Sequence, residues 1–113
     1  MQVAAIVVNY NDVETTLAQI ERLEALPSIA KVIVVDNHSR DDSRVRLKAR
    51  ACERVIFIQA KRNGGYGYGN NIGLYYAHEN HFDMALIANP DTYISEDVLK
   101  KMCVILKKNK KSS

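Results

Sequence analysis

The stretch Leu86–Thr92, which reads LIANPDT, is an apolar run that ends abruptly in a polar turn containing one carboxylate. Three earlier apolar runs end in the same way, at VNYND (8–12), VDNHS (35–39) and IQAKRN (58–63). Continuous apolar runs of this kind predict parallel strands that are buried on both faces. In an open sheet of such strands, ligands bind outside the carboxyl ends, so the four polar ends predict one shared crevice.

The segments between the apolar runs carry helical signals, namely acidic or Ser caps followed by apolar residues at helical spacing. We predict strands at about 3–8, 32–35, 55–58 and 84–88, and helices at about 13–26, 41–51, 70–79 and 95–106. This alternation is typical of an α/β fold. The fold class is therefore a three-layer sandwich with a mostly parallel sheet, for which we expect the Rossmann-like strand order 3-2-1-4.

The length of 113 residues fits one domain, placed at 1–106, followed by a basic tail at 107–113. The net charge of +3 is mild, and four lysines of the tail supply much of it. We expect a solvated terminus there, with contact to an anionic membrane surface as the alternative. Other basic residues are scattered, so the sequence does not predict a nucleic-acid partner.

Cys52 and Cys103 lie far apart and lack metal-ligand spacing, which predicts free and mostly buried thiols. His38, His78 and His81 also lack metal-ligand spacing, and we interpret them as non-catalytic. We find no signal peptide before the first predicted strand and no apolar run near the ~20 residues that span a bilayer. A cytoplasmic location, including the inner face of the membrane, is the expectation.

Two aspartates follow predicted strands. Pro90 ends the fourth strand, so Asp91 follows directly after it. A carboxylate at this position suits a divalent ion that also binds a diphosphate. The alternative is a plain turn, since Asn-Pro-Asp is equally common in turns. Asp36 ends the second strand, where a carboxylate commonly accepts hydrogen bonds from a ribose or base. Asp41, by contrast, is interpreted as a helix cap.

The loop after the first strand places Tyr10 between Asn9 and Asn11. The glycine fingerprints G-x-G-x-x-G and G-x-x-x-x-G-K are both absent, which argues against a typical dehydrogenase and against a P-loop enzyme. A flat ring between two amides is able to stack on a base and to hydrogen-bond it. Packing of Tyr10 in the core is the alternative.

The segment Arg62–Asn70 combines a cation with glycines and leads into a helix, which favours an anion site. The alternative is a flexible turn whose glycines serve positive φ. For Asn70, Asn71 and Gly73 we also expect a partial role in close packing of the helix.

Together, these segments resemble the front half of the inverting family-two glycosyltransferases of the GT-A fold. The matching segments are IVVNYN (6–11), VVDNHS (34–39), RNGGYGYGNNIG (62–73) and LIANPDT (86–92), and the resemblance extends over about residues 3–105. It implies a nucleotide-diphosphate sugar, UDP- or dTDP-linked, as donor. The implied donor-binding residues are Asn9, Tyr10, Asn11, Asp36, Asn37, Ser39, Arg62, Asn63, Gly64, Gly65, Asn70 and Asn89. Asp91 would be the last acid of the D-x-D motif and would bind Mg²⁺ or Mn²⁺.

The form Asn89-Pro90-Asp91 resembles rhamnosyl- and galactofuranosyltransferase-like members, which build bacterial surface polysaccharides. Family members continue beyond this strand with the part that supplies the general base and the site for a glycan or lipid-linked acceptor. The resemblance therefore covers a truncated fold, and we assign no catalytic base. A truncated sheet would expose the edge beside the fourth strand, which predicts a homo-oligomer or a partner that covers this edge.

Three alternatives remain from the sequence. They are a non-catalytic nucleotide-sugar-binding module, an oxidoreductase with an atypical dinucleotide site, and a structural assembly domain. The missing glycines after the first strand weigh against the oxidoreductase.

Overall fold

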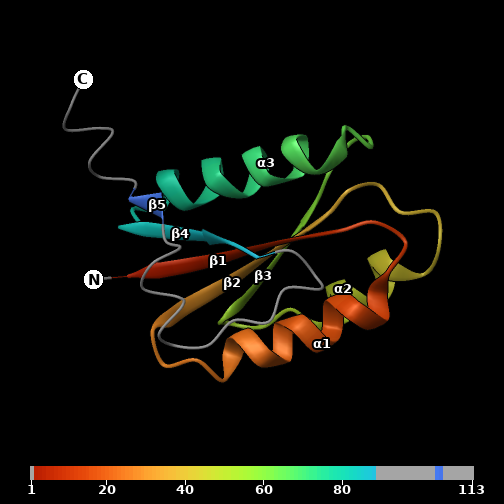
Figure 1. Ribbon diagram of the computed structural model, residues 1–113. Helices are drawn as coiled ribbons and strands as arrows, with labels where there is room; N and C mark the ends of the chain where they lie inside the picture. Colours follow the sequence, from red (N-terminus) through yellow and green to blue (C-terminus); the bar gives the residue numbers. More distant parts are fainter. Residues whose placement is uncertain (1, 89–103, 106–113) are drawn as a thin grey trace.

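The computed structural model describes residues 2–88 and 104–105 of the chain. Figure 1 shows strands and helices alternating from the N-terminus to β4. The elements are β1 (Val3–Asn9), α1 (Val13–Glu24), β2 (Ile29–Asp36), α2 (Ser43–Arg50), β3 (Val55–Gln59), α3 (Gly65–Glu79), β4 (Met84–Ile87) and β5 (Val104–Ile105).

The sheet has the strand order β3-β2-β1-β4-β5. β1 pairs in parallel with β2 and with β4, and β2 pairs in parallel with β3, so the predicted order 3-2-1-4 is confirmed. β1 lies between two neighbours, and all seven of its residues are buried. This burial explains its continuous apolar sequence, since a central parallel strand has no face that meets solvent.

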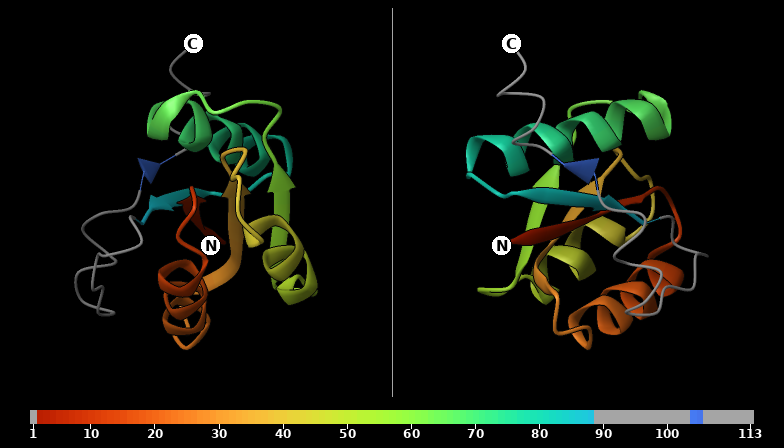
Figure 2. Two further views of the ribbon diagram at one scale, coloured as in Figure 1. Left: turned by 90° about the vertical axis from the view of Figure 1, so that its right-hand side faces the viewer. Right: turned by 60° about the vertical axis from the view of Figure 1, so that its left-hand side comes forward.

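Helices cover both faces of the sheet, which confirms the three-layer arrangement. Figures 1 and 2 show α1 and α2 on one face and α3 on the other. Alternate residues of β1 divide between the two layers, because successive side chains of a strand point to opposite faces. Val7 belongs to the apolar cluster that includes Ile20 of α1 and Leu47 of α2. Ile6 belongs to the cluster that includes Ala77 of α3.

Two glycines allow α3 to lie directly on β1. A Cβ at Gly69 would lie 2.7 Å from a methyl carbon of Val8, and one at Gly73 would lie 2.5 Å from a methyl carbon of Ile6. Neither separation is compatible with an ordinary side chain. The predicted packing role of Gly73 is therefore confirmed.

The start of α3 differs from the prediction. The helix begins at Gly65, five residues before the expected start at Asn70. The Asn63 side-chain oxygen accepts a hydrogen bond from the Gly65 N–H at 3.1 Å, and Gly65 has a φ of +84°. The turn therefore ends there. Gly69 and Gly73 are helical because packing on β1 outweighs their low helix propensity.

The sequence prediction was also wrong for Val104 and Ile105, which form a strand instead of the end of a helix. They pair antiparallel with Ala85 and Met84 of β4. The edge beside β4, expected to be exposed, is thus paired at these two residues. Self-association stays a prediction, although this pairing removes part of its basis. The expected helix start at Ser95 and the basic tail lie outside the described residues.

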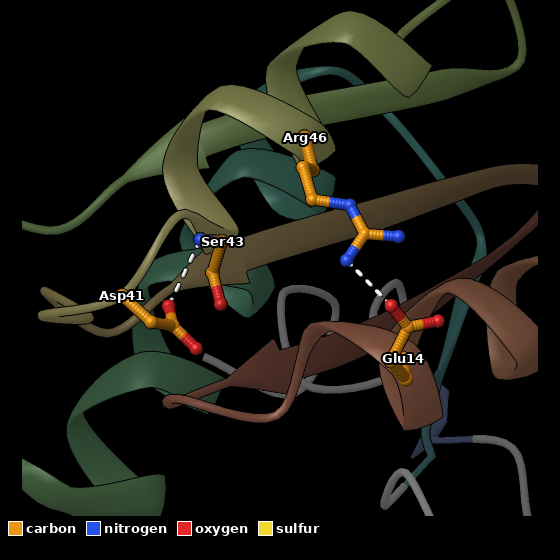
Figure 3. Close-up of polar contacts among 4 residues, drawn as sticks. All are labelled: Glu14, Asp41, Ser43 and Arg46. Carbon is orange, nitrogen blue, oxygen red and sulfur yellow. Dashed lines mark hydrogen bonds and ion pairs between the residues drawn. The ribbon is translucent and has the colours of Figure 1, made fainter.

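Two ion pairs join α1 to α2. Arg46 contacts Glu14 at 2.5 Å, as Figure 3 shows, and Arg50 pairs with Glu24. The Glu14 side chain is 77% exposed, so its pair contributes little to the free energy of unfolding.

The predicted caps are only partly correct. Asp42 occupies the N-cap position of α2, while Asp41 accepts a hydrogen bond from the Ser43 N–H at 2.9 Å (Figure 3). The Ser43 hydroxyl and backbone N–H lower the pKa of Asp41. Asp12 stands at the N-cap of α1 but makes no side-chain cap hydrogen bond.

Two further findings concern burial and the membrane. Cys52 is a free thiol as predicted, but it is exposed instead of buried, because it lies in the turn before β3. Within the part of the chain that the structure describes, no helix is long and apolar enough to cross a bilayer.

Candidate functional site

The carboxyl ends of β1, β2 and β3 meet at one edge of the sheet, on the right in Figure 1. Asn9 lies opposite Asp36, which in turn lies opposite Gln59. The Asn37 N–H donates to the Asn9 carbonyl at 2.8 Å, so pairing continues one step beyond the strands. β4 approaches the same edge, since the Ala88 N–H donates to the Ile6 carbonyl at 2.9 Å.

Asn9 and Asp36 contact each other, and both are completely buried. The Asn9 amide donates to Asp36 Oδ1 at 3.0 Å and to Ser39 Oγ at 3.2 Å. Its Oδ1 accepts a hydrogen bond from the Thr16 hydroxyl at 2.7 Å. Two polar residues are thus enclosed at the strand ends with internal partners, as buried polar groups require.

Ser39 joins the first two loops. Its hydroxyl donates to Asp36 Oδ1 at 2.6 Å and accepts from the Asn11 N–H at 2.9 Å. Its own N–H donates to Asp36 Oδ2 at 3.1 Å. Asn11 makes a second hydrogen bond between the same two loops, because its Oδ1 accepts from the Arg40 N–H at 2.8 Å.

Two residues of these loops have left-handed backbone conformations, Asn11 at a φ of +52° and His38 at +63°. This region is sparsely populated by residues other than glycine, and such strained positions cluster at functional sites. Tyr10 precedes Asn11 and is 36% exposed, so the core-packing alternative for its ring is wrong.

The third loop is attached to the second through Asn37. Its amide donates to Asn63 Oδ1 at 3.1 Å and to the Gly65 carbonyl at 2.9 Å. Asn37 is 2% exposed, and among the described residues its Oδ1 has no hydrogen-bond partner. The start of α3 therefore lies beside a buried acceptor whose hydrogen-bonding capacity is unused.

Gly64 and Gly65 are needed in this loop for two different reasons. A Cβ at Gly64 would lie 2.5 Å from the Tyr68 ring, whereas Gly65 serves a positive φ. The Arg62 guanidinium lies 4.7 Å from the centre of the same Tyr68 ring. The ring thus orients a cation beside the N-terminus of α3. Asn70 lies one turn further along the helix and is half-buried.

The predicted metal-site residues lie outside the described part of the chain. Asn89 and Asp91 belong to residues 89–103, so their placement relative to Asp36 stays a prediction. Within residues 2–88 and 104–105, no group of three His, Cys, Asp or Glu side chains is arranged to hold a metal ion. Asp36, the carboxylate of the described strand ends, is enclosed by protein donors and does not fit a metal ligand.

Sequence reasoning missed Thr16, which is fully buried and tethers Asn9 to α1. A signal was present in the sequence. Thr16 falls on the same helical face as Val13 and Ile20, where a polar residue interrupts an apolar stripe.

Known proteins share this sequence pattern and fold. The sequence pattern of Glycosyl transferase family 2 matches residues 4–113. The low-salt glycan biosynthesis hexosyltransferase Agl10 of Haloferax volcanii is 29% identical over 101 residues, which cover 88% of this chain and 31% of that protein. The chain therefore spans about a third of the length of this curated relative.

Two solved structures have a similar fold. S. aureus TarS in complex with UDP has a TM-score of 0.65 at 28% identity, over 89% of this chain and 30% of that one. The mannosyltransferase PcManGT of Pyrobaculum calidifontis, in complex with GDP-Man and Mn²⁺, has a TM-score of 0.69 at 21% identity, over 86% and 30%. The fold, the order of the polar strand ends and the extent of the family match lead to one conclusion: this chain belongs to glycosyl transferase family 2.

Proposed function

We propose that this chain forms the donor-binding part of a glycosyltransferase that uses a nucleotide-diphosphate sugar. One observation carries the proposal: three loops at the carboxyl edge of the sheet are joined by hydrogen bonds that the Asn9 and Asn37 amides donate and that the Ser39 hydroxyl accepts from the Asn11 N–H. This edge, where β1 has β2 on one side and β4 on the other, is the topological switch point at which open α/β sheets bind ligands. The UDP in the TarS complex supports the same class of ligand.

Exposed groups of this edge, together with one buried acceptor, suit the parts of a UDP- or dTDP-linked donor. Tyr10 offers an exposed ring for stacking on the base. The unused Oδ1 of Asn37 is an acceptor for a base N–H. Arg62, the exposed backbone of Gly64 and Gly65 and the start of α3 favour the diphosphate, because a helix N-terminus attracts anions.

The finer parts of the proposal depend on the sequence. Asp91, with Asn89 beside it, would bind Mg²⁺ or Mn²⁺, and the Mn²⁺ in the PcManGT complex supports such an ion. We further propose an inverting transfer to a hydroxyl of a glycan or lipid-linked acceptor, with a rhamnosyl- or galactofuranosyl-type donor and a role in surface polysaccharide synthesis. A cytoplasmic location at the inner membrane face and self-association complete the proposal.

Calorimetric titration and thermal unfolding test the donor class. UDP-, dTDP- and GDP-sugars are added with and without Mn²⁺. We expect binding of a UDP or dTDP compound and a higher Tm, since a ligand at 100-fold its Kd stabilises the folded state by about 2.7 kcal/mol. Arg62→Ala should weaken binding at least tenfold, while Arg44→Ala, which removes an exposed arginine of α2, should leave the Kd unchanged.

The same titration tests the metal and the alternatives. In Asp91→Ala the Mn²⁺-dependent part of the binding should disappear, whereas the exposed α1 variant Glu21→Ala should retain it. Binding of a nucleotide sugar without transfer or hydrolysis would favour a binding module. Metal-independent binding of NAD would favour the oxidoreductase. Binding of neither ligand would favour an assembly domain and contradict the proposal.

A further inference from the structure

The Ser39 hydroxyl has no hydrogen-bonding capacity left for a ligand. A serine hydroxyl has one donor and two acceptor lone pairs. Its donor goes to Asp36 Oδ1, and its two lone pairs accept from the Asn9 amide and the Asn11 N–H. A donor sugar or ribose would have to break one of these bonds to reach Ser39.

Asp36 uses most of its accepting capacity within the protein, since three of the roughly four acceptor sites of its carboxylate are filled. Both of its carboxyl oxygens accept hydrogen bonds, Oδ1 from Asn9 and Ser39 and Oδ2 from the Ser39 N–H. The residue is 0% exposed, so no route from solvent reaches the carboxyl group in this structure. A contact between Asp36 and a ribose would expose and break the same bonds that hold the two loops together.

Thr16 fixes this cluster to the body of the protein. Its hydroxyl donates to Asn9 Oδ1, and Thr16 itself is buried in the first turns of α1. Hydrogen bonds thus connect a helix, two strand ends and two loops. We call the connected residues the inter-loop network: Asn9, Asn11, Thr16, Asp36 and Ser39. Its outer member Asn11 has a φ of +52°, in the left-handed region that asparagine adopts more readily than most residues other than glycine.

We infer that Asn9, Asp36 and Ser39 are positioning residues. They hold the loop containing Tyr10 and Asn11 in the conformation that receives the donor, and they do not contact it. The inference rests on the proposed function in one respect, namely that the ligand is a nucleotide sugar. Its physical basis is preorganisation, since a loop that is ordered before binding loses less conformational entropy on binding.

Amide hydrogen exchange and UDP affinity test the inference together. Ser39→Ala removes the acceptor of the Asn11 N–H, so the exchange rate of that amide should rise at least tenfold in the absence of nucleotide. The Kd for UDP should rise at least tenfold. Ile29→Val, which shortens a buried side chain at the far end of β2, serves as the control for lost stability and should change neither quantity selectively.

A second pair of variants acts at the buried end of the network. Thr16→Val keeps the size of the side chain but removes the donor to Asn9, and should raise the Kd for UDP and the exchange rate of the Asn11 amide. Thr16→Ser retains the hydroxyl and should restore both toward wild-type values. A merely structural role of Thr16 would lower Tm in both variants without changing the Kd.

The outcomes are distinguishable. Faster exchange at Asn11 with an unchanged Kd would overturn the inference, and so would an unchanged exchange rate in Ser39→Ala. If the wild-type chain binds no nucleotide, the proposed function fails, while the exchange rates still decide whether the network orders the loop.

Discussion

The two ends of the sheet use polar side chains in opposite ways. At the amino end, the exposed Arg54 guanidinium donates to the carbonyls of Glu24 and Ile29 at 3.0 and 2.8 Å. At the carboxyl end, the completely buried Asn9 and Asp36 bond to side chains of neighbouring loops. The exposed Arg54 only satisfies backbone carbonyls at the end of α1 and the start of β2. Buried side chains that fix loop conformations are instead expected where a ligand binds, because a binding site needs rigid support.

The largest effect on stability should come from the carboxyl end. Asn9→Ala leaves the Thr16 hydroxyl without its acceptor and removes a donor from buried Asp36, so we expect a loss of roughly 3 kcal/mol in the free energy of unfolding. Arg54→Ala, at the amino end, should lose about 1 kcal/mol, since water can replace an exposed donor. Urea denaturation of both variants measures the difference. Equal losses would contradict the distinction between the two ends.

A smaller effect is expected from the approach of α3 to the sheet near the carboxyl end of β1. Gly69→Ala would force a Cβ within 2.7 Å of Val8 and should cost about 2 kcal/mol by overpacking. Gly67 lies in the same helix with open space around it, so Gly67→Ala should raise stability by up to about 1 kcal/mol. Thermal unfolding of the two variants measures both effects. A higher Tm for Gly69→Ala than for the wild type would show that α3 does not lie in close contact with β1.

Two exposed tyrosines sharpen the comparison through binding. Tyr10 follows β1 at the carboxyl edge, whereas Tyr75 is 69% exposed in the later turns of α3. Loss of a ring that stacks on a base costs about 1–3 kcal/mol, so Tyr10→Ala should raise the Kd for UDP about tenfold or more. Tyr75→Ala should leave it unchanged. Calorimetry with UDP measures both, and an unaffected Tyr10→Ala would exclude the stacking role.

The smallest effect concerns Asp41, whose pKa is lowered in the folded state by Ser43. A lowered folded-state pKa gives stability that is present above the ordinary value of 3.8 and is lost as the pH falls through the folded pKa. Asp41→Ala should therefore lower Tm slightly, and by the same amount at pH 7 and pH 5. The difference should shrink only below pH 3.8. If the difference in Tm between the wild type and Asp41→Ala vanished between pH 7 and pH 5, a group other than Asp41 would be responsible for it.

The sequence was sufficient for the order of the parallel strands, because each is a short apolar run followed by polar residues. It misplaced the start of α3, since glycines at 65, 67 and 69 indicate a turn until the packing of Gly69 and Gly73 on β1 is known. It also missed β5, whose two residues are strand only through their pairing with distant β4.

For the site, the sequence indicated that Asn9 and Asp36 would meet, because both end neighbouring parallel strands. It did not show that they face the protein interior, since that depends on Thr16 and Ser39 closing over them. Partners that come from another loop leave only a faint trace in the sequence, such as one threonine on an apolar helical face.

An NMR titration with UDP tests the central claim most directly, because backbone amide signals report which end of the sheet the nucleotide contacts. We predict shifts concentrated at Tyr10, Asn11 and residues 62–65, with small changes at the amino end around Arg54. Shifts centred on the amino end, or none at millimolar UDP, would contradict the assignment of the nucleotide-sugar site to the carboxyl edge.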